Sequence, residues 1–340
     1  MRFPWVNVAL LVLLLLQVAS GYLGFVNGEE QQAWLLWVHG MGAYALVWLL
    51  WWKGAVVWAV LQRGQRWTWA RVSFLVAVAL LLLTLALGLL WTFGGPRYFL
   101  GFSLVSLHIY VAVPLILLLA FHAWRKRWIL GMQRAVDRRA FLRLALASAA
   151  GALTWQLARH WQGARRFTGS YEVGSMGGRF PYVSWINDDP APISPGDWRL
   201  ALGGNVWQPL ALDYDALLQM AAEERVATID CTGGWYSHQV WRGVSLQSVL
   251  AQAGVQDGAR SVLLRSATGY WRRFGLEEAL VEGGGFLLAT HVAGAPLAHG
   301  HGFPARLVAP GLRGFNWVKW VVEIRVENVS AWLQPPLPLQ

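Results

Sequence analysis

One cysteine and three histidines are the residues of this 340-residue chain that stand out as candidates for chemistry. Cys231 is the only cysteine and lies in "VATIDCTGGWYSHQVWRGVSLQSVL". A single cysteine excludes an internal disulfide and any zinc or iron–sulfur site built from several cysteines. The segment ends a predicted strand and opens a Gly-Gly turn, a kind of loop that often carries function, although a buried structural thiol is the alternative. His39, His108 and His122 lie instead within long apolar stretches.

The apolar stretches that hold these histidines predict a membrane bundle. Four of them occupy residues 4–26, 33–61, 71–93 and 101–124, each near the ~20 residues that cross a bilayer as a helix. Residues 1–166 carry 16 Lys and Arg against 3 acidic residues, whereas residues 167–340 carry 12 against 15. By the positive-inside rule, the basic connections place the N-terminus and residues 125–134 in the cytoplasm. Because the positive charge flanks apolar helices, we expect no nucleic-acid binding.

His39 and His108 are predicted to lie at one depth near the outer surface, because the second and fourth spans run in the same direction. Two imidazoles that face each other across a helical bundle are the usual axial ligands of a b-type haem. His122 follows His108 by 14 residues, which puts it on the same helix face at the opposite depth, but the matching position after His39 is Lys53. We therefore predict one haem b, with His122 as a snorkelling or quinone-site residue. Buried structural histidines are the alternative.

The region around Cys231 resembles the sulfite oxidase family. "DCTGGWYSHQVWRGVSLQSVL" is similar to its cysteine segment, and "HVAGAPLAHGHGFPARLVAPGLRGFNWVKWVVEIRV" is similar to its closing segment. "SATGYWRRFGLEEALVEGGGFLLAT" resembles the central stretch, and "DWRLALGGNVWQPLALDYDAL" resembles the first strand and helix. The resemblance covers about residues 180–328. It implies a mixed α+β sulfite-oxidase fold that binds molybdenum through one molybdopterin.

This resemblance implies a set of site residues. Cys231 would be the molybdenum ligand, since a thiolate is the soft anionic ligand that the metal needs. Fixed positive charges and N–H donors would hold the pterin phosphate. The predicted cofactor-binding residues are Asn187, His301, Arg306, Asn316 and Lys319. Surface charges or a structural histidine are the alternative at these positions.

The segment "TGYWRR" supplies candidates for substrate binding. Tyr270, predicted as catalytic together with Cys231, and Trp271 are candidates for substrate contact. Arg272 and Arg273 are candidates for attracting an anion. An ordinary aromatic turn is the alternative reading of the segment.

The segment between the two halves, "DRRAFLRLALASAAGALTW", resembles a twin-arginine export leader although it begins at residue 137. Such leaders export proteins that have already folded around a cofactor. We predict that this one exports the second half and remains as a fifth helix, on the same side of the membrane as the haem. Alternatively, Arg138 and Arg139 are positive-inside residues before an ordinary last span.

The predicted architecture is an all-α transmembrane bundle of four spans plus a fifth anchor helix, followed by an α+β domain with the sulfite-oxidase fold. Residues 1–130 resemble the small four-helix cytochrome b subunits of bacterial oxidoreductases. Residues 131–165 form the leader-like segment and fifth helix, and residues 166–340 the molybdopterin-binding domain. We expect the chain in the bacterial inner membrane, with this domain on the periplasmic side.

The predicted function is a molybdenum oxidoreductase that exchanges electrons between the quinone pool, haem b and an oxygen-atom-transfer site. We expect membrane lipid, quinone or quinol, and a small or protein-bound S- or N-oxide such as methionine sulfoxide as partners. We expect no room for the dimerisation domain of sulfite-oxidising members, and in length we expect the chain to be closer to periplasmic methionine sulfoxide reductases. A sulfite-oxidising dehydrogenase and a haem-only electron-transfer or sensor protein are the alternatives.

Overall fold

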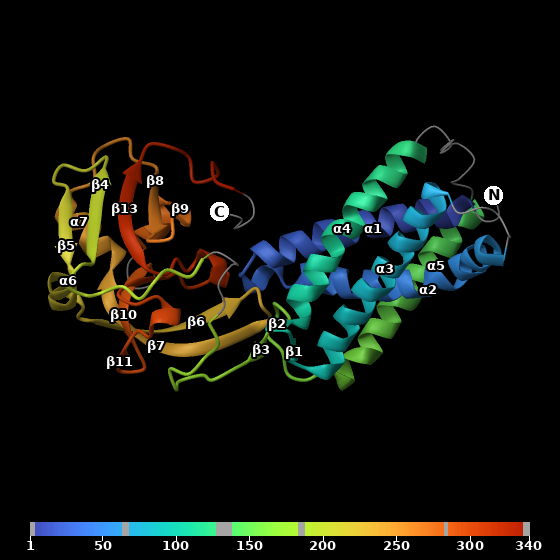
Figure 1. Cartoon of the computed structure of the whole chain (residues 1–340), viewed down its shortest axis with the longest axis horizontal. Helices are drawn as coiled ribbons and strands as arrows, with labels where there is room; N and C mark the ends of the chain where they lie inside the picture. The colour runs from blue at the N-terminus through green and yellow to red at the C-terminus, as the bar shows by residue number, and fades with distance from the viewer. Residues whose placement is uncertain (1–3, 63–67, 127–137, 183–187, 282–284, 336–340) are drawn as a thin grey trace. The chain divides into compact units, whose positions relative to one another are not determined.

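The computed structural model describes residues 4–62, 68–126, 138–182, 188–281 and 285–335. It divides into two compact units, a helical unit at Met1–Tyr171 and a strand unit at Glu172–Gln340 (Figure 1). The predicted three-part division at residues 1–130, 131–165 and 166–340 stays a prediction.

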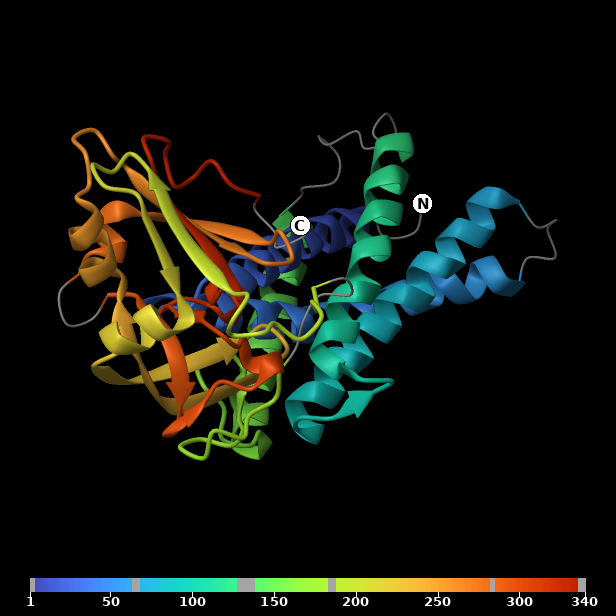
Figure 2. The same ribbon diagram turned by 60° about the vertical axis from the view of Figure 1, so that its left-hand side comes forward.

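The described part of the helical unit contains long apolar helices. They are α1 (Pro4–Val26), α2 (Trp34–Gln62), α3 (Trp69–Gly94), α4 (Leu104–Lys126) and α5 (Arg138–Ala158). Short elements are η1 (Glu30–Gln32), η3 (Arg159–Trp161), β1 (Tyr98–Phe99) and β2 (Phe102–Ser103). The β1–β2 hairpin joins α3 to α4 (Figure 2). All five long helices have the length and composition to cross a membrane, which agrees with the predicted apolar stretches. That they span one stays a prediction.

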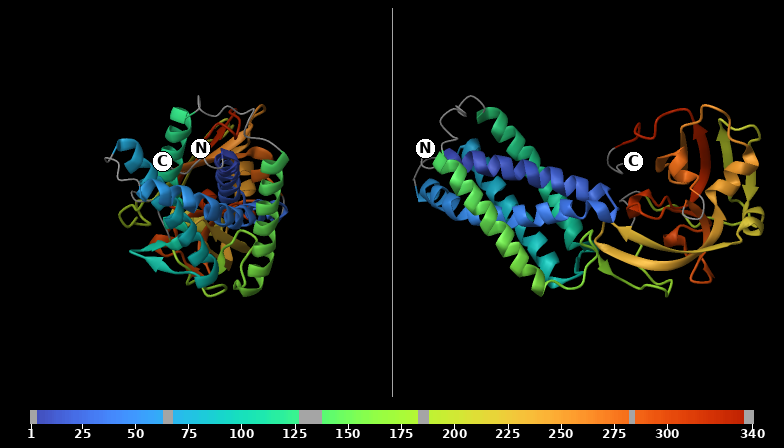
Figure 3. Two further views of the ribbon diagram at one scale, coloured as in Figure 1. Left: turned by 90° about the vertical axis from the view of Figure 1, so that its right-hand side faces the viewer. Right: turned by 180° about the vertical axis from the view of Figure 1, so that it is seen from behind.

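Helices α1, α2 and α5 pack along one another, and α3 packs along α4 (Figure 3). Small residues allow the close approach of α2 and α5, because a Cβ at Gly151 would lie 2.7 Å from the backbone nitrogen of Ala45. The residues buried between α1, α2 and α5 are Val6, Ala9, Leu13, Ala45, Leu46, Leu49 and Ala147.

The strand unit carries a six-stranded sheet in the order β11-β10-β7-β3, in which β6 also pairs with β7 and β12 with β10. The β10–β11, β10–β12, β10–β7 and β6–β7 pairs are antiparallel. The strands are β3 (Tyr171–Glu172), β6 (Glu223–Cys231), β7 (Trp235–Ser245), β10 (Leu287–Val292), β11 (Ala295–Pro296) and β12 (Arg306–Val308).

A second sheet of five strands has the order β5-β4-β13-β8-β9, with β4 and β13 parallel and the other pairs antiparallel. Its strands are β4 (Arg199–Gly204), β5 (Leu210–Asp213), β8 (Ser261–Ser266), β9 (Trp271–Gly275) and β13 (Val321–Glu327). The helical elements are α6 (Tyr214–Met220), α7 (Leu246–Ala253), α8 (Leu276–Ala279), η4 (His299–His301) and η5 (Gly314–Asn316).

One apolar core joins both sheets and the short helices of the strand unit. Trp241, Leu246, Leu264 and Leu287 are completely buried in it. Segregated strands and short helices around one core define an α+β domain. The predicted α+β class of the second half is therefore confirmed.

Candidate active site

A tight hairpin presents Cys231. Strand β6 ends at Cys231, β7 begins at Trp235, and these two residues lie directly opposite each other. The Gly234 N–H donates to the Cys231 carbonyl at 3.0 Å, which closes the turn. Gly234 has a φ of 88°, a conformation that favours glycine. The thiol sulfur of Cys231 accepts a hydrogen bond from the Gly233 N–H at 3.3 Å.

The segment that includes η5 supports this hairpin from the side. The Arg313 guanidinium donates to the Asp230 carboxylate at 2.6 Å, and their side chains are only 5% and 4% exposed. Gly314 packs so closely that a Cβ there would lie 3.1 Å from the Cα of Cys231. A buried ion pair of this kind needs both partners, because either charge alone would be costly. Sequence reasoning missed Arg313 and Asp230, although both lie within the segments that carry the family resemblance.

Two of the predicted cationic residues, the buried Arg306 and the half-buried Lys319, lie next to each other. The Arg306 guanidinium donates to the carbonyls of His301 at 3.0 Å and Trp317 at 3.3 Å. The Lys319 ammonium donates to the Gly300 carbonyl at 3.2 Å. Gly302 separates the two side chains, since a Cβ there would lie 3.0 Å from the Arg306 Cβ and 3.1 Å from the Lys319 Cβ.

His301 lies at the end of η4 and is buried against Phe180. The two rings stack at 4.0 Å with an angle of 10° between their planes, and His301 Nε2 donates to the Phe180 carbonyl at 2.9 Å. This packing holds the carbonyl of His301 toward Arg306. The structure thus places His301 beside the two cations, as a residue that orients them.

The cations and the thiol influence one another electrostatically. Burial raises the pKa of the Cys231 thiol, whereas the Gly233 N–H and the charges of Arg313 and Lys319 lower it. Burial lowers the pKa of Arg306 to about 9 and that of Lys319 to about 8. Such shifts arise when charges are removed from water without a full complement of opposite charge. The site is therefore suited to an anionic ligand.

The donors around Cys231 fit the phosphate-bearing molybdenum cofactor that the resemblance implies. Arg306 is 3% exposed, and its Nε makes no hydrogen bond within the described part of the chain. The indole N–H of Trp235 is likewise buried and makes no hydrogen bond there. A Cβ added at Gly233 would lie 3.5 Å from the Cys231 sulfur and 3.6 Å from the Trp235 indole nitrogen, so glycine keeps this space open. Buried unpaired donors beside a thiol are what an anionic, sulfur-ligated group would satisfy.

The predicted residues at the start of β9 are tied to η5. The Tyr270 hydroxyl donates to the Phe315 carbonyl at 2.6 Å, and Arg272 Nε donates to the Asn316 side-chain oxygen at 3.0 Å. Burial raises the pKa of Tyr270, so its hydroxyl stays neutral. Both contacts place these side chains as supports of η5. A direct role of Tyr270 in substrate contact stays a prediction.

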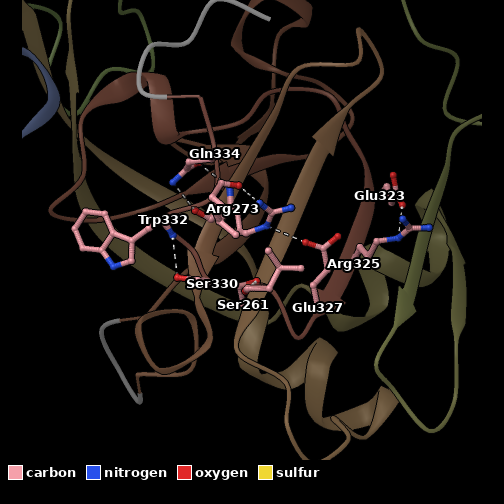
Figure 4. Close-up of polar contacts among 10 residues, drawn as sticks. Ser261, Arg273, Glu323, Arg325, Glu327, Ser330, Trp332 and Gln334 are labelled. Atoms are coloured by element: carbon pink, nitrogen blue, oxygen red, sulfur yellow. Dashed lines mark hydrogen bonds and ion pairs between the residues drawn. The ribbon is translucent and has the colours of Figure 1, made fainter.

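Arg272 and Arg273 also contact the C-terminal segment. Figure 4 shows Arg273 beside Gln334 and Glu327. Arg273 Nε lies 2.8 Å from the Glu327 carboxylate, and Arg272 donates to the Pro335 carbonyl at 3.2 Å. The Gln334 side chain accepts from the Arg273 N–H at 3.1 Å and donates to the Arg273 carbonyl at 3.0 Å. Both arginines thus have protein partners. The guanidinium of Arg273 lies 5.1 Å above the Trp271 ring.

The helical unit brings His39 and His108 together. Their ring centroids are 6.2 Å apart and their planes are nearly perpendicular, at 81°. The Nδ1 atom of His39 lies 3.1 Å from the Gln17 carbonyl, and that of His108 lies 2.8 Å from the Thr84 carbonyl. A carbonyl can only accept, so each Nδ1 is the donor and each Nε2 is left as the basic nitrogen.

The remaining predicted residues lie outside these two clusters. Asn187 falls outside the described residues. His122 lies exposed near the end of α4, and Arg138 and Arg139 are exposed at the start of α5. Their predicted roles stay predictions.

Comparison with known proteins bears on the strand unit. Residues 188–331 match the family model of the oxidoreductase molybdopterin binding domain. The MsrP catalytic subunit of protein-methionine-sulfoxide reductase from Xanthomonas axonopodis pv. citri is 34% identical, over 42% of this chain and 50% of its own length. The uncharacterized oxidoreductase YuiH of Bacillus subtilis is 33% identical, over 38% of this chain and 67% of its own length. Mouse mitochondrial sulfite oxidase is 30% identical, over 43% of this chain and 32% of its own length.

The matched domain and the site geometry define a molybdopterin-binding oxidoreductase. The chain belongs to the family of oxidoreductases that carry this domain. It spans half the length of the Xanthomonas relative and about a third of the mouse enzyme. The predicted enzyme class and the predicted molybdopterin cofactor are thereby confirmed.

Proposed function

We propose that this molybdopterin oxidoreductase is anchored in the bacterial inner membrane and exchanges electrons between the quinone pool, one haem b and an oxygen-atom-transfer site at Cys231. The anchoring is supported by five helices whose length and composition suit a bilayer. The orientation is supported by the basic connections, which would lie in the cytoplasm. The twin-arginine reading of Arg138 and Arg139 would place the strand unit outside, on the side of His39 and His108.

The histidine pair carries the haem part of the proposal. The 6.2 Å separation of their ring centroids supports the proposal that His39 and His108 would both ligate one haem iron. Axial histidines commonly donate their other N–H to a backbone carbonyl, which fixes the tautomer and the ring orientation. Both rings have such a carbonyl partner.

Glycines on the neighbouring helices support the same arrangement. A Cβ at Gly21 of α1 would lie 2.9 Å from the His39 ring, and one at Gly88 of α3 would lie 3.2 Å from the His108 ring. A larger residue at Gly21 would have to displace the His39 ring, and one at Gly88 would crowd the His108 ring. Close packing of this kind holds both rings in a fixed orientation, as a ligand pair requires.

In the strand unit, the residues have separate tasks. Bound molybdenum would supply the two-electron chemistry of oxygen-atom transfer. Cys231 would ligate it as a thiolate, held in place by the Gly233 N–H. Arg306 and Lys319 would hold the pterin phosphate, because cations that are partly removed from water gain most from an anion. Asp230 and Arg313 would keep the hairpin and η5 together around the metal.

An uncharged oxide such as methionine sulfoxide is the substrate class that the site favours. Arg272 and Arg273, the residues expected to attract an anion, are engaged with Asn316, with Glu327 and with the C-terminal segment. The similarity to a methionine-sulfoxide reductase subunit supports the same substrate. Sulfite oxidation, suggested by the similarity to sulfite oxidase, is the alternative.

Purified full-length chain tests the proposal. We expect one molybdenum and one haem per chain, a reduced-minus-oxidised spectrum of a low-spin b haem, and haem-linked turnover with quinol and methionine sulfoxide. Two haems per chain would contradict the single-haem assignment. Turnover with sulfite but not with any S- or N-oxide would favour the alternative.

A further inference from the structure

Trp235 is the cross-strand partner of Cys231. The two residues face each other directly at the end of the β6–β7 ladder. Side chains of such a pair stand on the same face of the sheet, with Cβ atoms about 4.5–5.5 Å apart. Trp235 is only 2% exposed. Its indole is therefore fixed next to the thiol and shielded from water.

The indole N–H of Trp235 differs from those of the other buried tryptophans of the strand unit. Buried N–H groups nearly always donate a hydrogen bond, because leaving one unmade is costly. Trp235 Nε1 makes none within the described residues. In the other buried tryptophans, the indole N–H donates to a backbone carbonyl at 2.9 to 3.2 Å. These tryptophans are Trp198, Trp241, Trp317 and Trp320.

A space over Gly233 lies within reach of both the indole and the thiol. A Cβ at Gly233 would lie 3.5 Å from the Cys231 sulfur and 3.6 Å from Trp235 Nε1. One point is therefore within van der Waals distance of both atoms. An acceptor atom placed near it would lie beside the sulfur and could receive the indole hydrogen.

We propose that Trp235 binds the molybdenum cofactor, by donating its indole hydrogen bond to an acceptor that lies beside the Cys231 sulfur in the space over Gly233. Donors that surround a metal centre orient its ligands and tune its electronic properties. The inference rests on the molybdenum site of the proposed function. It is independent of the haem, the membrane and the substrate.

The first test compares Trp235→Phe with Trp198→Phe in the full-length chain. Both tryptophans are 2% exposed, but only Trp198 loses a hydrogen bond that exists without cofactor, the one to the Val321 carbonyl at 3.1 Å. Each protein is purified from cells that make or lack the pterin. Trp235→Phe should retain molybdenum about tenfold less well than the parent chain, as expected for one hydrogen bond to a charged group. Trp198→Phe should retain it like the parent chain.

Two further readouts separate a cofactor contact from a packing effect. Without cofactor, Trp235→Phe should be at least as stable to heat as Trp198→Phe, because it breaks no existing hydrogen bond. With cofactor, the molybdenum(V) paramagnetic resonance signal should change in Trp235→Phe and stay unchanged in Trp198→Phe.

The second test fills the space itself. Gly233 does not have a positive φ, and its new Cβ would make ordinary contacts, so Gly233→Ala should fold. We expect it to lose cofactor retention, because the methyl group would occupy the acceptor's position. Gly203→Ala is the matched control, since a Cβ there meets nothing within 4 Å. The result with Gly233→Ala tests the proposal even if Trp235→Phe does not fold.

The inference is overturned if Trp235→Phe and Gly233→Ala both retain molybdenum with the parent's resonance signal. It is also overturned if Trp235→Phe loses stability to the same extent with and without cofactor. A parent chain without molybdenum would refute the site itself, an outcome distinct from an unchanged variant of a loaded chain.

Discussion

The two units build their candidate sites from opposite kinds of side chain. The helical unit presents His39 and His108, whose Nδ1 atoms donate to backbone carbonyls. The strand unit places the buried Arg306 and Arg313 and the half-buried Lys319 near one thiol. Charges inside a bilayer are expensive, so imidazoles suit the proposed membrane helices, whereas buried cations are stabilised by an anionic ligand. The proposed haem and the molybdenum cofactor would therefore be held by different physical means, by ring nitrogens in one unit and by cations in the other.

The largest expected effect comes from removing the thiol. Cys231→Ser should abolish turnover, because an alcohol is a far harder and less acidic ligand than a thiolate. The haem spectrum should remain intact, since Cys231 and the histidines belong to different units. Activity assays together with the optical spectrum check this. Full activity in Cys231→Ser would remove the basis of the molybdenum assignment.

Replacing the two facing histidines tests the candidate site of the helical unit. His39→Ala or His108→Ala should eliminate the low-spin haem spectrum, because each removes one of two axial nitrogens. Molybdenum content should not change. His122→Ala serves as the matched control and should keep the haem. If His122→Ala loses haem while His39→Ala retains it, the assignment of His39 as an axial ligand is wrong.

The side of the membrane on which the strand unit lies is predicted to depend on Arg138 and Arg139. If a receptor reads the guanidinium pair, the double change to Lys should block export although the charge is unchanged, since Lys lacks the planar fork of Arg. The helical unit should still insert and hold haem, while the strand unit stays cytoplasmic. Protease added to spheroplasts measures this exposure in the variant and in the parent chain. If the variant with Arg138→Lys and Arg139→Lys is still cleaved from outside, α5 is an ordinary membrane span and not an export leader.

A smaller effect should appear as a pH dependence of cofactor binding to the strand unit. In the cofactor-free chain, Lys319 with a pKa of about 8 is protonated below that pH and neutral above it. Association of the phosphate-bearing pterin should therefore weaken, by about tenfold, as the pH rises through 8. Lys319→Gln should remove this step, because Arg306 stays protonated throughout this range. Association that strengthens with rising pH would contradict the assignment.

The smallest expected effect concerns the C-terminal segment. Gln334→Ala removes the hydrogen bonds to both backbone groups of Arg273 and should cost about 1–2 kcal/mol of stability. Thermal unfolding of the full chain measures the change. Trp332→Ser is the control, because the Trp332 side chain is 89% exposed and should contribute little. Equal unfolding temperatures for Gln334→Ala and the parent chain would show that the segment does not stabilise β9.

Several features followed from the sequence by itself. Hydropathy over consecutive residues is a local property, so it predicted the five apolar helices and the change to an α+β second half. Cys231 stood out because it is the only thiol. Arg306 and Lys319 followed from the family motif, and the structure places both within electrostatic range of Cys231.

Only the tertiary structure decided which polar groups meet. Arg313 and Asp230 are 83 residues apart in the chain, and their pairing depends on how η5 packs against β6. The hydrogen bond of Arg272 to the Pro335 carbonyl and the ion pair of Arg273 with Glu327 are also decided by the fold, while the predicted role of the two arginines in attracting an anion stays a prediction. The unpaired indole N–H of Trp235 is likewise invisible in sequence, because a hydrogen bond is present or absent only once every neighbour has been placed.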